Sequence, residues 1–285
     1  MTNGNAQVNR TVKNVIVTVF LMLITAMVLV PFIWMIFMSF RTTGAILENP
    51  YGFPETFRIQ NYTQLLFSPR IHFYTYFLNS VVVTLGAMLI TLVLSTMGGY
   101  GFGRRRYNFR FRALLFSILL FALMLPRQAM YIPQFVMMTR YNLLNTRLSL
   151  ILLYAAYGIS VSTFLLKTYF SQLPEEMEES ARMDGAGDFL IFYKIMLPLA
   201  RPVLSTVILL NLREFWNELL IALTMVTKPA LRTLPLAMMH FVGENAANYA
   251  MAAASLVVGM LPLLILYLIL AERFVEGITA GAIKG

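Results

Sequence analysis

Long apolar segments alternate with short polar ones along the chain, and this pattern predicts its architecture. An α-helix needs about 20 apolar residues to cross a hydrocarbon core roughly 30 Å thick. Six segments reach or approach that length: 15–38, 77–98, 113–138, 148–170, 202–226 and 252–270. Proline kinks or interrupts helices, and it occurs in the first segment at Pro31 and in the third at Pro126 and Pro133. The pattern predicts an all-α polytopic membrane protein with six transmembrane helices.

The composition argues against the other broad classes of protein. Of the 285 residues, 59% are hydrophobic and 12% are charged, and the mean hydropathy is +0.71. Soluble domains carry about 25% charged residues, and disordered chains lack the 13% aromatic content found here. With no cysteine and only His72 and His240, far apart, neither a disulfide framework nor a metal centre is expected. The formal charge of +9 is therefore attributed to cytoplasmic loops rather than to nucleic-acid binding.

Positive charges predict the orientation of these segments. Five arginines follow the second apolar segment: Arg104, Arg105, Arg106, Arg110 and Arg112. Because cytoplasmic loops are enriched in Arg and Lys, the cluster predicts that both termini are cytoplasmic. The expected parts are a cytoplasmic tail at 1–13, a first transmembrane helix at 14–38 and an extracytoplasmic loop at 39–73. A transmembrane core at 74–271, containing a cytoplasmic loop at 171–201, and a cytoplasmic tail at 272–285 complete the chain.

The cytoplasmic loop at 171–201 carries the local signals of a helix, a sharp turn and a second helix. Glu178 and Arg182 are spaced to pair on the first helix, and Gly185 can adopt a positive φ and end it. Asp188 is expected to cap the second helix, and Pro198 to stop it. On these signals alone, a solvated hairpin that merely links two membrane helices is supported as well as a functional site.

The spacing within this loop resembles the EAA loop of the permease subunits of bacterial binding-protein-dependent ABC importers. The family pattern is Glu-Ala-Ala, three residues, Gly, nine residues, Ile-x-Leu-Pro. The chain matches it with Glu179, Ser180, Ala181, Gly185, Ile195, Leu197 and Pro198, and departs from it only at Ser180. Asp184-Gly185-Ala186 matches the Asp-Gly-Ala that often accompanies the motif. The segments 273–277 and 281–285 resemble the C-terminus of carbohydrate-type permeases, specifically the maltose-type second permease subunit.

The resemblance implies a type I ABC importer permease fold and a role in importing a sugar or related polyol across the bacterial plasma membrane. The implied partners are a second permease subunit, two ATPase subunits, an extracytoplasmic solute-binding protein and membrane lipid. The residues implied in docking the ATPase are Glu179, Ser180, Ala181, Asp184, Gly185, Ile195, Leu197 and Pro198. No phosphate-binding P-loop sequence is present. The chain is therefore not expected to be an enzyme or to bind a cofactor, and ATP and Mg are assigned to the ATPase.

Charged residues lie inside the fifth predicted helix. Arg213 lies about 17 Å along that helix from Pro202, near the midplane, where an unpaired charge costs at least roughly 2.5–3.5 kcal/mol. The candidate residues of a translocation path are Arg213, Glu214, Trp216, Asn217 and Glu218. A structural Arg–Glu pair between helices is an equal alternative, and a lone Trp more often packs against neighbouring helices than on a sugar. Arg127 marks either a second polar break or the outer end of a short third helix.

Two other functions fit the sequence. An importer of glycerol phosphodiesters or another phosphorylated polyol would share the same C-terminal pattern. A secondary carrier driven by an ion gradient would normally need more helices and an acidic relay, for which the group around Arg213 and Glu218 is the only support. The two halves show no sequence repeat, which argues against the inverted-repeat carriers.

The absence of cysteine allows the orientation to be tested with single cysteines. We predict that Asn61→Cys, in the loop 39–73, reacts with a membrane-impermeant thiol reagent in intact cells and that Asn108→Cys, inside the arginine cluster, does not. Arginine-rich loops are retained on the cytoplasmic side. Labelling of Asn108→Cys alone would show that the orientation is the opposite of the predicted one.

Overall fold

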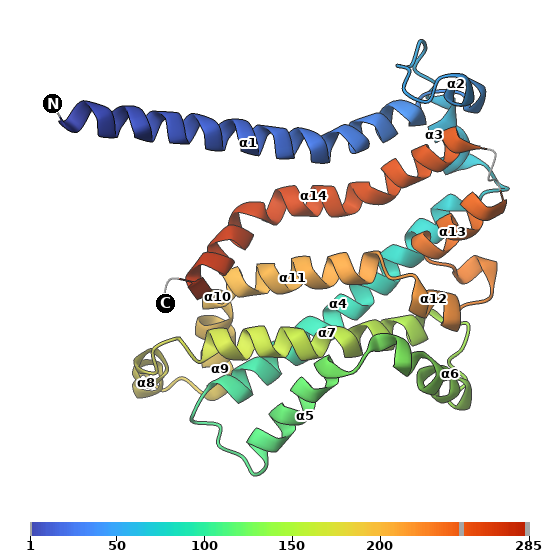
Figure 1. Ribbon diagram of the computed structural model, residues 1–285. Helices are drawn as coiled ribbons and strands as arrows, with labels where there is room; N and C mark the ends of the chain where they lie inside the picture. The colour runs from blue at the N-terminus through green and yellow to red at the C-terminus, as the bar shows by residue number, and fades with distance from the viewer. Residues whose placement is uncertain (1, 245–247, 283–285) are drawn as a thin grey trace. The chain divides into compact units, whose positions relative to one another are not determined.

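The computed structural model describes residues 2–244 and 248–282, and the side chains of residues 13–239 and 248–270. The C-terminal pattern at 273–285 and His240 lie outside the described side chains. Every regular element in the described part of the chain is a helix (Figure 1). The chain divides into two compact units. The first contains the residues up to Ile71 with His240–Val258, and the second contains His72–Met239 with the residues from Gly259.

The longest helices are α1 (Thr2–Ser39), α4 (Phe73–Gly103), α7 (Arg147–Phe170), α11 (Arg201–Trp216) and α14 (Tyr249–Ala282). The shorter ones are α2 (Thr43–Glu48), α3 (Gln60–Phe67), α5 (Arg112–Met124), α6 (Tyr131–Arg140), α8 (Glu176–Met183), α9 (Asp188–Ile191), α10 (Leu197–Leu199), α12 (Leu220–Met225) and α13 (Leu234–Glu244). A π-helical segment, Phe192–Met196, joins α9 to α10. The described residues of the tail predicted at 1–13 are thus part of α1, and α14 continues into the tail predicted at 272–285.

Among the described residues, four helices are long and apolar enough to span a membrane: Lys13–Ser39, Phe73–Gly103, Arg147–Phe170 and Tyr249–Leu270. Two bent pairs raise the number to six when each is counted as one span. The pairs are Arg112–Met124 with Arg127–Arg140, bent by 102°, and Asp188–Leu199 with Arg201–Trp216, bent by 73°. The predicted class, an all-α protein with several membrane spans, is confirmed.

The predicted helix 113–138 is interrupted at Pro126, as its proline indicated, because a residue before proline is driven out of the α region, and Leu125 has φ −75° and ψ 127°. The second interruption expected at Pro133 is not found, since α6 continues through that residue. The boundary of one other predicted helix is corrected. The predicted helix 202–226 ends at Trp216, and α12 begins at Leu220. Arg213 therefore lies in the last turn of α11 and not in the middle of a continuous helix.

The second unit is organised by the contact between α4 and α7 (Figure 1). Small residues recur every four positions along α4 and are fully buried at Ala87, Thr91 and Ser95. Continuing the same row, Gly99 and Gly103 lie directly against α7: a Cβ built on Gly99 would be 2.5 Å from Leu166 Cβ, and one on Gly103 would be 2.9 Å from Phe170 Cβ. Small residues four apart allow membrane helices to approach at backbone distance, so glycine is required here by the packing.

In the first unit, the segment 39–71 is more ordered than its turn-rich sequence suggests. Buried Arg41 donates hydrogen bonds to the carbonyl oxygens of Ala45 (2.6 Å) and Asn49 (2.8 Å). Asn61 Nδ2 donates to the carbonyls of Ser39 (2.7 Å) and Arg41 (2.9 Å). Because Asn61→Cys removes both of these bonds, exposed Glu55 in the same segment is the better position for the cysteine label.

We predict that Gly99→Leu lowers the stability of the fold by about 1–3 kcal/mol, the usual cost of overpacking a tight interface. Gly101→Leu is the matched control, because a Cβ at Gly101 meets nothing within 4 Å and both substitutions replace a helical glycine. The measurement is the midpoint of thermal unfolding of the purified chain in detergent. Equal midpoints for the two variants would contradict the close approach of α4 and α7.

Candidate functional site

The hairpin formed by α8 and α9 turns at Gly185. The Gly185 φ is +84°, as its sequence context predicted. Gly185 N–H donates to Arg182 O (2.9 Å) and Ala186 N–H donates to Ala181 O (3.0 Å), which is the hydrogen-bond pattern of a Schellman motif. A side chain at Gly185 would meet no atom within 4 Å, so its positive φ, and not crowding, favours glycine.

Asp188 does not cap the second helix of the hairpin, contrary to the sequence-based expectation. Gly187 occupies the N-cap position without a side-chain hydrogen bond, and Asp188 is the first helical residue. The Asp188 carboxylate instead accepts from Arg182 Nη2 (3.0 Å) and lies 3.7 Å from Arg106 Nε. The Asp188 carboxylate is thus paired with two guanidinium groups instead of accepting from the free backbone N–H groups at the start of α9.

The second half of the motif forms an unusual helical turn. The chain is π-helical over Phe192–Met196, and Leu197 N–H donates to Phe192 O. Pro198 has no N–H to donate to the preceding turn, and the wider π turn comes directly before it. The helix continues through Pro198 to Leu199 instead of stopping before it. Ile195 packs against a buried cluster that includes Phe170 of α7, fully buried Ile191 and Met196.

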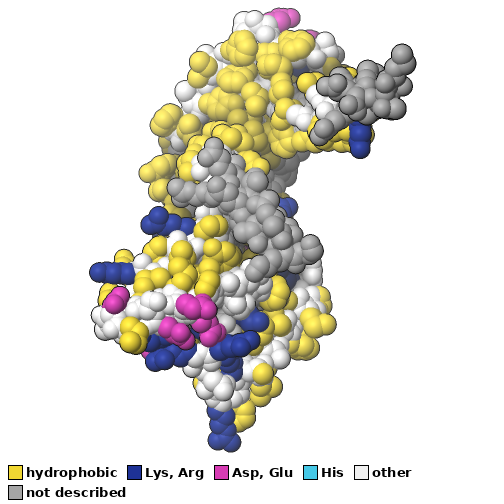
Figure 2. Space-filling model, turned by 90° about the vertical axis from the view of Figure 1, so that its left-hand side faces the viewer, with side chains coloured by type: hydrophobic (Ala, Val, Ile, Leu, Met, Phe, Trp, Pro, Cys, Tyr) yellow, Lys and Arg dark blue, Asp and Glu magenta, His cyan; other side chains and the backbone are white. Residues whose placement is uncertain are grey.

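The hairpin has an apolar outer surface, which we define as Met183, Phe189 and Tyr193. These side chains are 89%, 78% and 59% exposed, and the rings of Phe189 and Tyr193 stack with centroids 6.4 Å apart. Four of the residues implied in docking the ATPase are also exposed, namely Glu179, Ser180, Asp184 and Gly185, whereas Ala181 packs inward. Figure 2 shows acidic and basic side chains gathered together on the side of the molecule where α8 lies in Figure 1. One side of the hairpin is therefore packed against the rest of the second unit, and the other side is exposed.

The inner side of the hairpin holds a buried ion pair that the sequence analysis did not identify. Arg104, the first residue after α4, and Glu178 of α8 are hydrogen-bonded to each other, with side-chain exposures of 2% and 4%. Arg182 Nη2 also reaches Glu178 Oε2 at 3.3 Å, as the i, i+4 spacing predicted. Burial alone lowers the pKa of Arg182, but its hydrogen bonds to Asp188 and Glu178 raise the pKa above its ordinary value.

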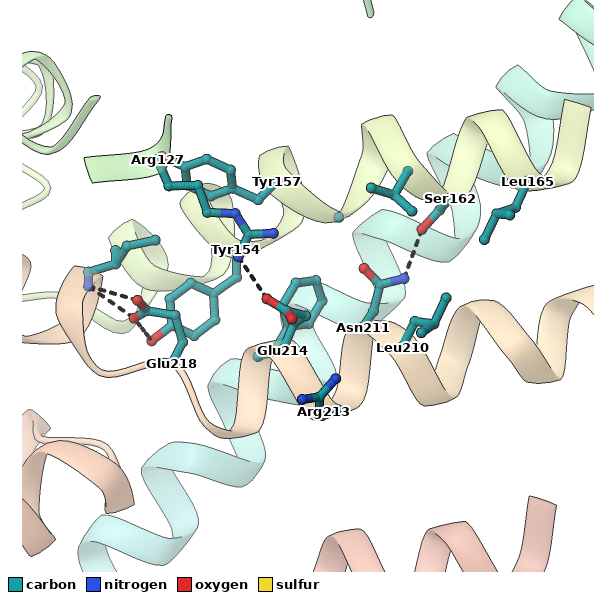
Figure 3. A pocket seen from close by; sticks show the side chains of 14 residues that line it. Arg127, Tyr154, Tyr157, Ser162, Leu165, Leu210, Asn211, Arg213, Glu214 and Glu218 are labelled. Atoms are coloured by element: carbon teal, nitrogen blue, oxygen red, sulfur yellow. Dashed lines mark hydrogen bonds and ion pairs between the residues drawn. The ribbon is translucent and has the colours of Figure 1, made fainter. Parts of the chain in front are cut away.

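A cavity of about 170 Å³ lies between α7 and α11, and it contains three of the five candidate path residues (Figure 3). Glu214 in its wall accepts a 2.7 Å hydrogen bond from Arg127 Nη1, and both side chains are about half exposed. The Arg127 guanidinium also lies 5.1 Å from the centre of the Tyr157 ring. An interhelical Arg–Glu pair thus exists, but its cation is Arg127, at the break between α5 and α6. Arg213 is exposed at the cavity lining.

Glu218 serves mainly to hold the backbone of the broken fifth helix. Both of its carboxylate oxygens accept from Ile221 N–H at 3.0 Å, and Oε2 also accepts from Ala222 N–H at 3.2 Å. The Tyr154 hydroxyl donates to the same oxygen at 3.2 Å. These N–H groups are at the start of α12, so Glu218 satisfies donors that a helix start leaves free.

Trp216 and Asn217, the other two candidate path residues, do not line this cavity. Trp216 is 5% exposed, its Nε1 donates to Gly259 O (2.9 Å), and its ring packs edge-on against Phe77. Asn217 Nδ2 donates to Arg213 O (2.9 Å) and closes the end of α11. The indole is therefore part of the packing between helices.

The family model described as "Binding-protein-dependent transport system inner membrane component" matches residues 95–279. The chain is 32% identical to the diacetylchitobiose uptake system permease protein NgcG of Streptomyces coelicolor, over 93% of this chain and 87% of the relative. It is 31% identical to the trehalose/maltose transport system permease protein MalG of Thermococcus litoralis, over 96% and 98%.

A further relative is the sulfoquinovosyl glycerol transport system permease protein SmoH of Agrobacterium fabrum, which is 34% identical over 90% of this chain and 89% of its own length. Among solved structures, a bacterial ABC transporter involved in the import of the acidic polysaccharide alginate superposes with a TM-score of 0.79 at 24% identity. That match covers 93% of this chain and 98% of the other, and shows the fold.

We predict that Glu218→Gln destabilises the protein more than Glu214→Gln does. The first substitution leaves one acceptor oxygen for the start of α12 and should cost about 0.5–2 kcal/mol, as for other helix caps. The second breaks a half-exposed ion pair, worth roughly 0–1 kcal/mol. Thermal unfolding midpoints in detergent compare the two variants, and a larger loss for Glu214→Gln would contradict the capping role.

Proposed function

The chain belongs to the family of inner membrane components of binding-protein-dependent transport systems, and on this premise we propose that it is the permease subunit through which a sugar or related polyol is imported. The family assignment overturns the alternative of a secondary carrier driven by an ion gradient. The observation that carries the proposal is the α8–α9 hairpin, in which a glycine turn with positive φ holds an exposed apolar surface beside the exposed EAA residues.

The relatives support the sugar class of substrate. Their names specify diacetylchitobiose, trehalose/maltose and sulfoquinovosyl glycerol. The cavity is consistent with a neutral polyhydroxyl solute, because its two arginines are balanced by Glu214 and Glu218. Its other polar groups include Ser162 and Asn211, which are hydrogen-bonded to each other at 2.8 Å. This balance of charge favours a sugar over a glycerol phosphodiester, whose anionic group would call for an excess of positive charge.

We propose the remaining components of the importer as well, and the family, whose transport systems depend on a binding protein, supports them. A second permease, two ATPase subunits and an extracytoplasmic solute-binding protein complete the assembly, and the ATPase subunits bind ATP and Mg. The apolar surface of Met183, Phe189 and Tyr193, with Glu179 nearby, is exposed and of the kind that marks protein interaction sites. The proposal requires that the hairpin is cytoplasmic and, with six spans, that both termini are cytoplasmic too, which the arginine cluster supports.

Gly185→Val tests the proposed role of the hairpin. Valine at a φ of +84° costs about 1–3 kcal/mol of strain or re-aims α9. We expect the variant to reach the membrane but to lose ATPase co-purification and substrate-stimulated ATP hydrolysis in reconstituted vesicles. Gly187→Val is the matched control, since Gly187 has a φ of −73° and open space around it.

Wild-type values for both measurements in Gly185→Val would mean that the hairpin is only a linker. The same vesicles, supplied with the solute-binding protein, distinguish the substrate classes. Uptake of labelled oligosaccharides supports the proposal, whereas uptake of a glycerol phosphodiester alone would favour the phosphorylated polyol.

A further inference from the structure

The buried pair of Arg104 and Glu178 joins elements that are far apart in the sequence. Besides Glu178, the Arg104 guanidinium binds three backbone carbonyls. Nη1 donates to Phe170 O (2.9 Å) and Leu173 O (2.7 Å), and Nη2 donates to Pro174 O (3.0 Å). All three guanidinium nitrogens are therefore used, and the side chain has no freedom to follow one partner without the others.

Each end of this contact is attached to a rigid element. Arg104 directly follows Gly103, where α4 touches α7, and Phe170 is the last residue of α7. Glu178 lies within α8, one residue before Glu179 of the EAA pattern. Arg104 thus connects α8 with the C-terminal ends of both α4 and α7.

The other charges around the hairpin are of a different kind. Arg106 and Asp188 are 55% and 48% exposed and 3.7 Å apart, so water screens their attraction. Arg104 and Glu178 are shielded from water, and removing the charge of Glu178 leaves Arg104 buried without the carboxylate that balances it. Apolar side chains would hold the hairpin at a lower desolvation cost, and the fixed fork of the guanidinium adds a defined direction to the contact.

We infer that the Arg104–Glu178 pair is the mechanical linkage that couples movement of the α8–α9 hairpin to the membrane helices. The two residues are positioning residues: they touch neither substrate nor nucleotide, and they convert the displacement of the docked hairpin into movement of α4 and α7. The inference rests on the proposed function, since it requires that an ATPase moves the hairpin. The inference assigns ATPase docking to the outer surface of the hairpin and transmission of its movement to the inner side.

The test is Glu178→Gln in the complete importer, reconstituted in vesicles with its ATPase and solute-binding protein. The substitution keeps the shape of the side chain and removes its charge. We expect the ATPase to co-purify and to hydrolyse ATP near the wild-type rate, while solute transported per ATP hydrolysed falls roughly tenfold, within the usual range of coupling free energies. Asp188→Asn is the control, which removes an exposed carboxylate of the same network and should leave the ratio unchanged.

A conservative variant distinguishes transmission from mere stability. Glu178→Asp retains the charge and should recover part of the transport ratio. Wild-type coupling in Glu178→Gln would overturn the inference, and so would loss of ATPase co-purification, because the pair would then only support docking. If Glu178→Gln does not reach the membrane, Arg104→Lys replaces it, because lysine keeps the positive charge but loses the guanidinium fork. A wild-type ratio in Arg104→Lys with a stable ATPase complex would equally overturn the inference. Failure of the wild-type chain to bind an ATPase would instead contradict the proposed function.

Discussion

The close contact between α4 and α7 is the constraint on which the rest of the second unit depends. Without side chains at Gly99 and Gly103, the two backbones approach until a Cβ on either glycine would collide with α7. Apolar burial drives helix association only weakly in a membrane, so close packing has to supply the attraction. The contact also brings Arg104 to the last carbonyl of α7, and this position determines where the α8–α9 hairpin can attach.

Polar side chains stabilise the breaks in this otherwise apolar fold. A helix end in an apolar environment exposes backbone groups that need partners. At the break after α11, Glu218 accepts from the first N–H groups of α12. At the other end of α12, Asn145 N–H donates to Met225 O (3.0 Å), and Asn145 Oδ1 accepts from the backbone N–H groups of Thr227 and Lys228. The break between α11 and α12 is therefore compatible with an apolar environment, because backbone groups at both ends of α12 are satisfied locally.

The hairpin separates two kinds of contact on its two sides. Its inner side combines the buried cluster around Phe170 and Met196 with the ion pair of Arg104 and Glu178. Its outer side carries the stacked rings of Phe189 and Tyr193. An element that is packed and ionically tied on one side and apolar and open on the other is suited to pass a displacement from a bound partner to the membrane helices.

The sequence by itself determined the features that depend on local signals. The lengths of the apolar segments predicted the membrane spans, and the position of Gly185 predicted the turn of the hairpin, because hydropathy and backbone freedom belong to single residues and short windows. The partners of the charged residues were decided by the tertiary structure. Glu178 pairs with Arg104, 74 residues away, and Glu214 pairs with Arg127, 87 residues away. Such pairs depend on how the packed helices are rotated and aligned against one another. Apolar segments of similar composition do not determine that rotation or alignment.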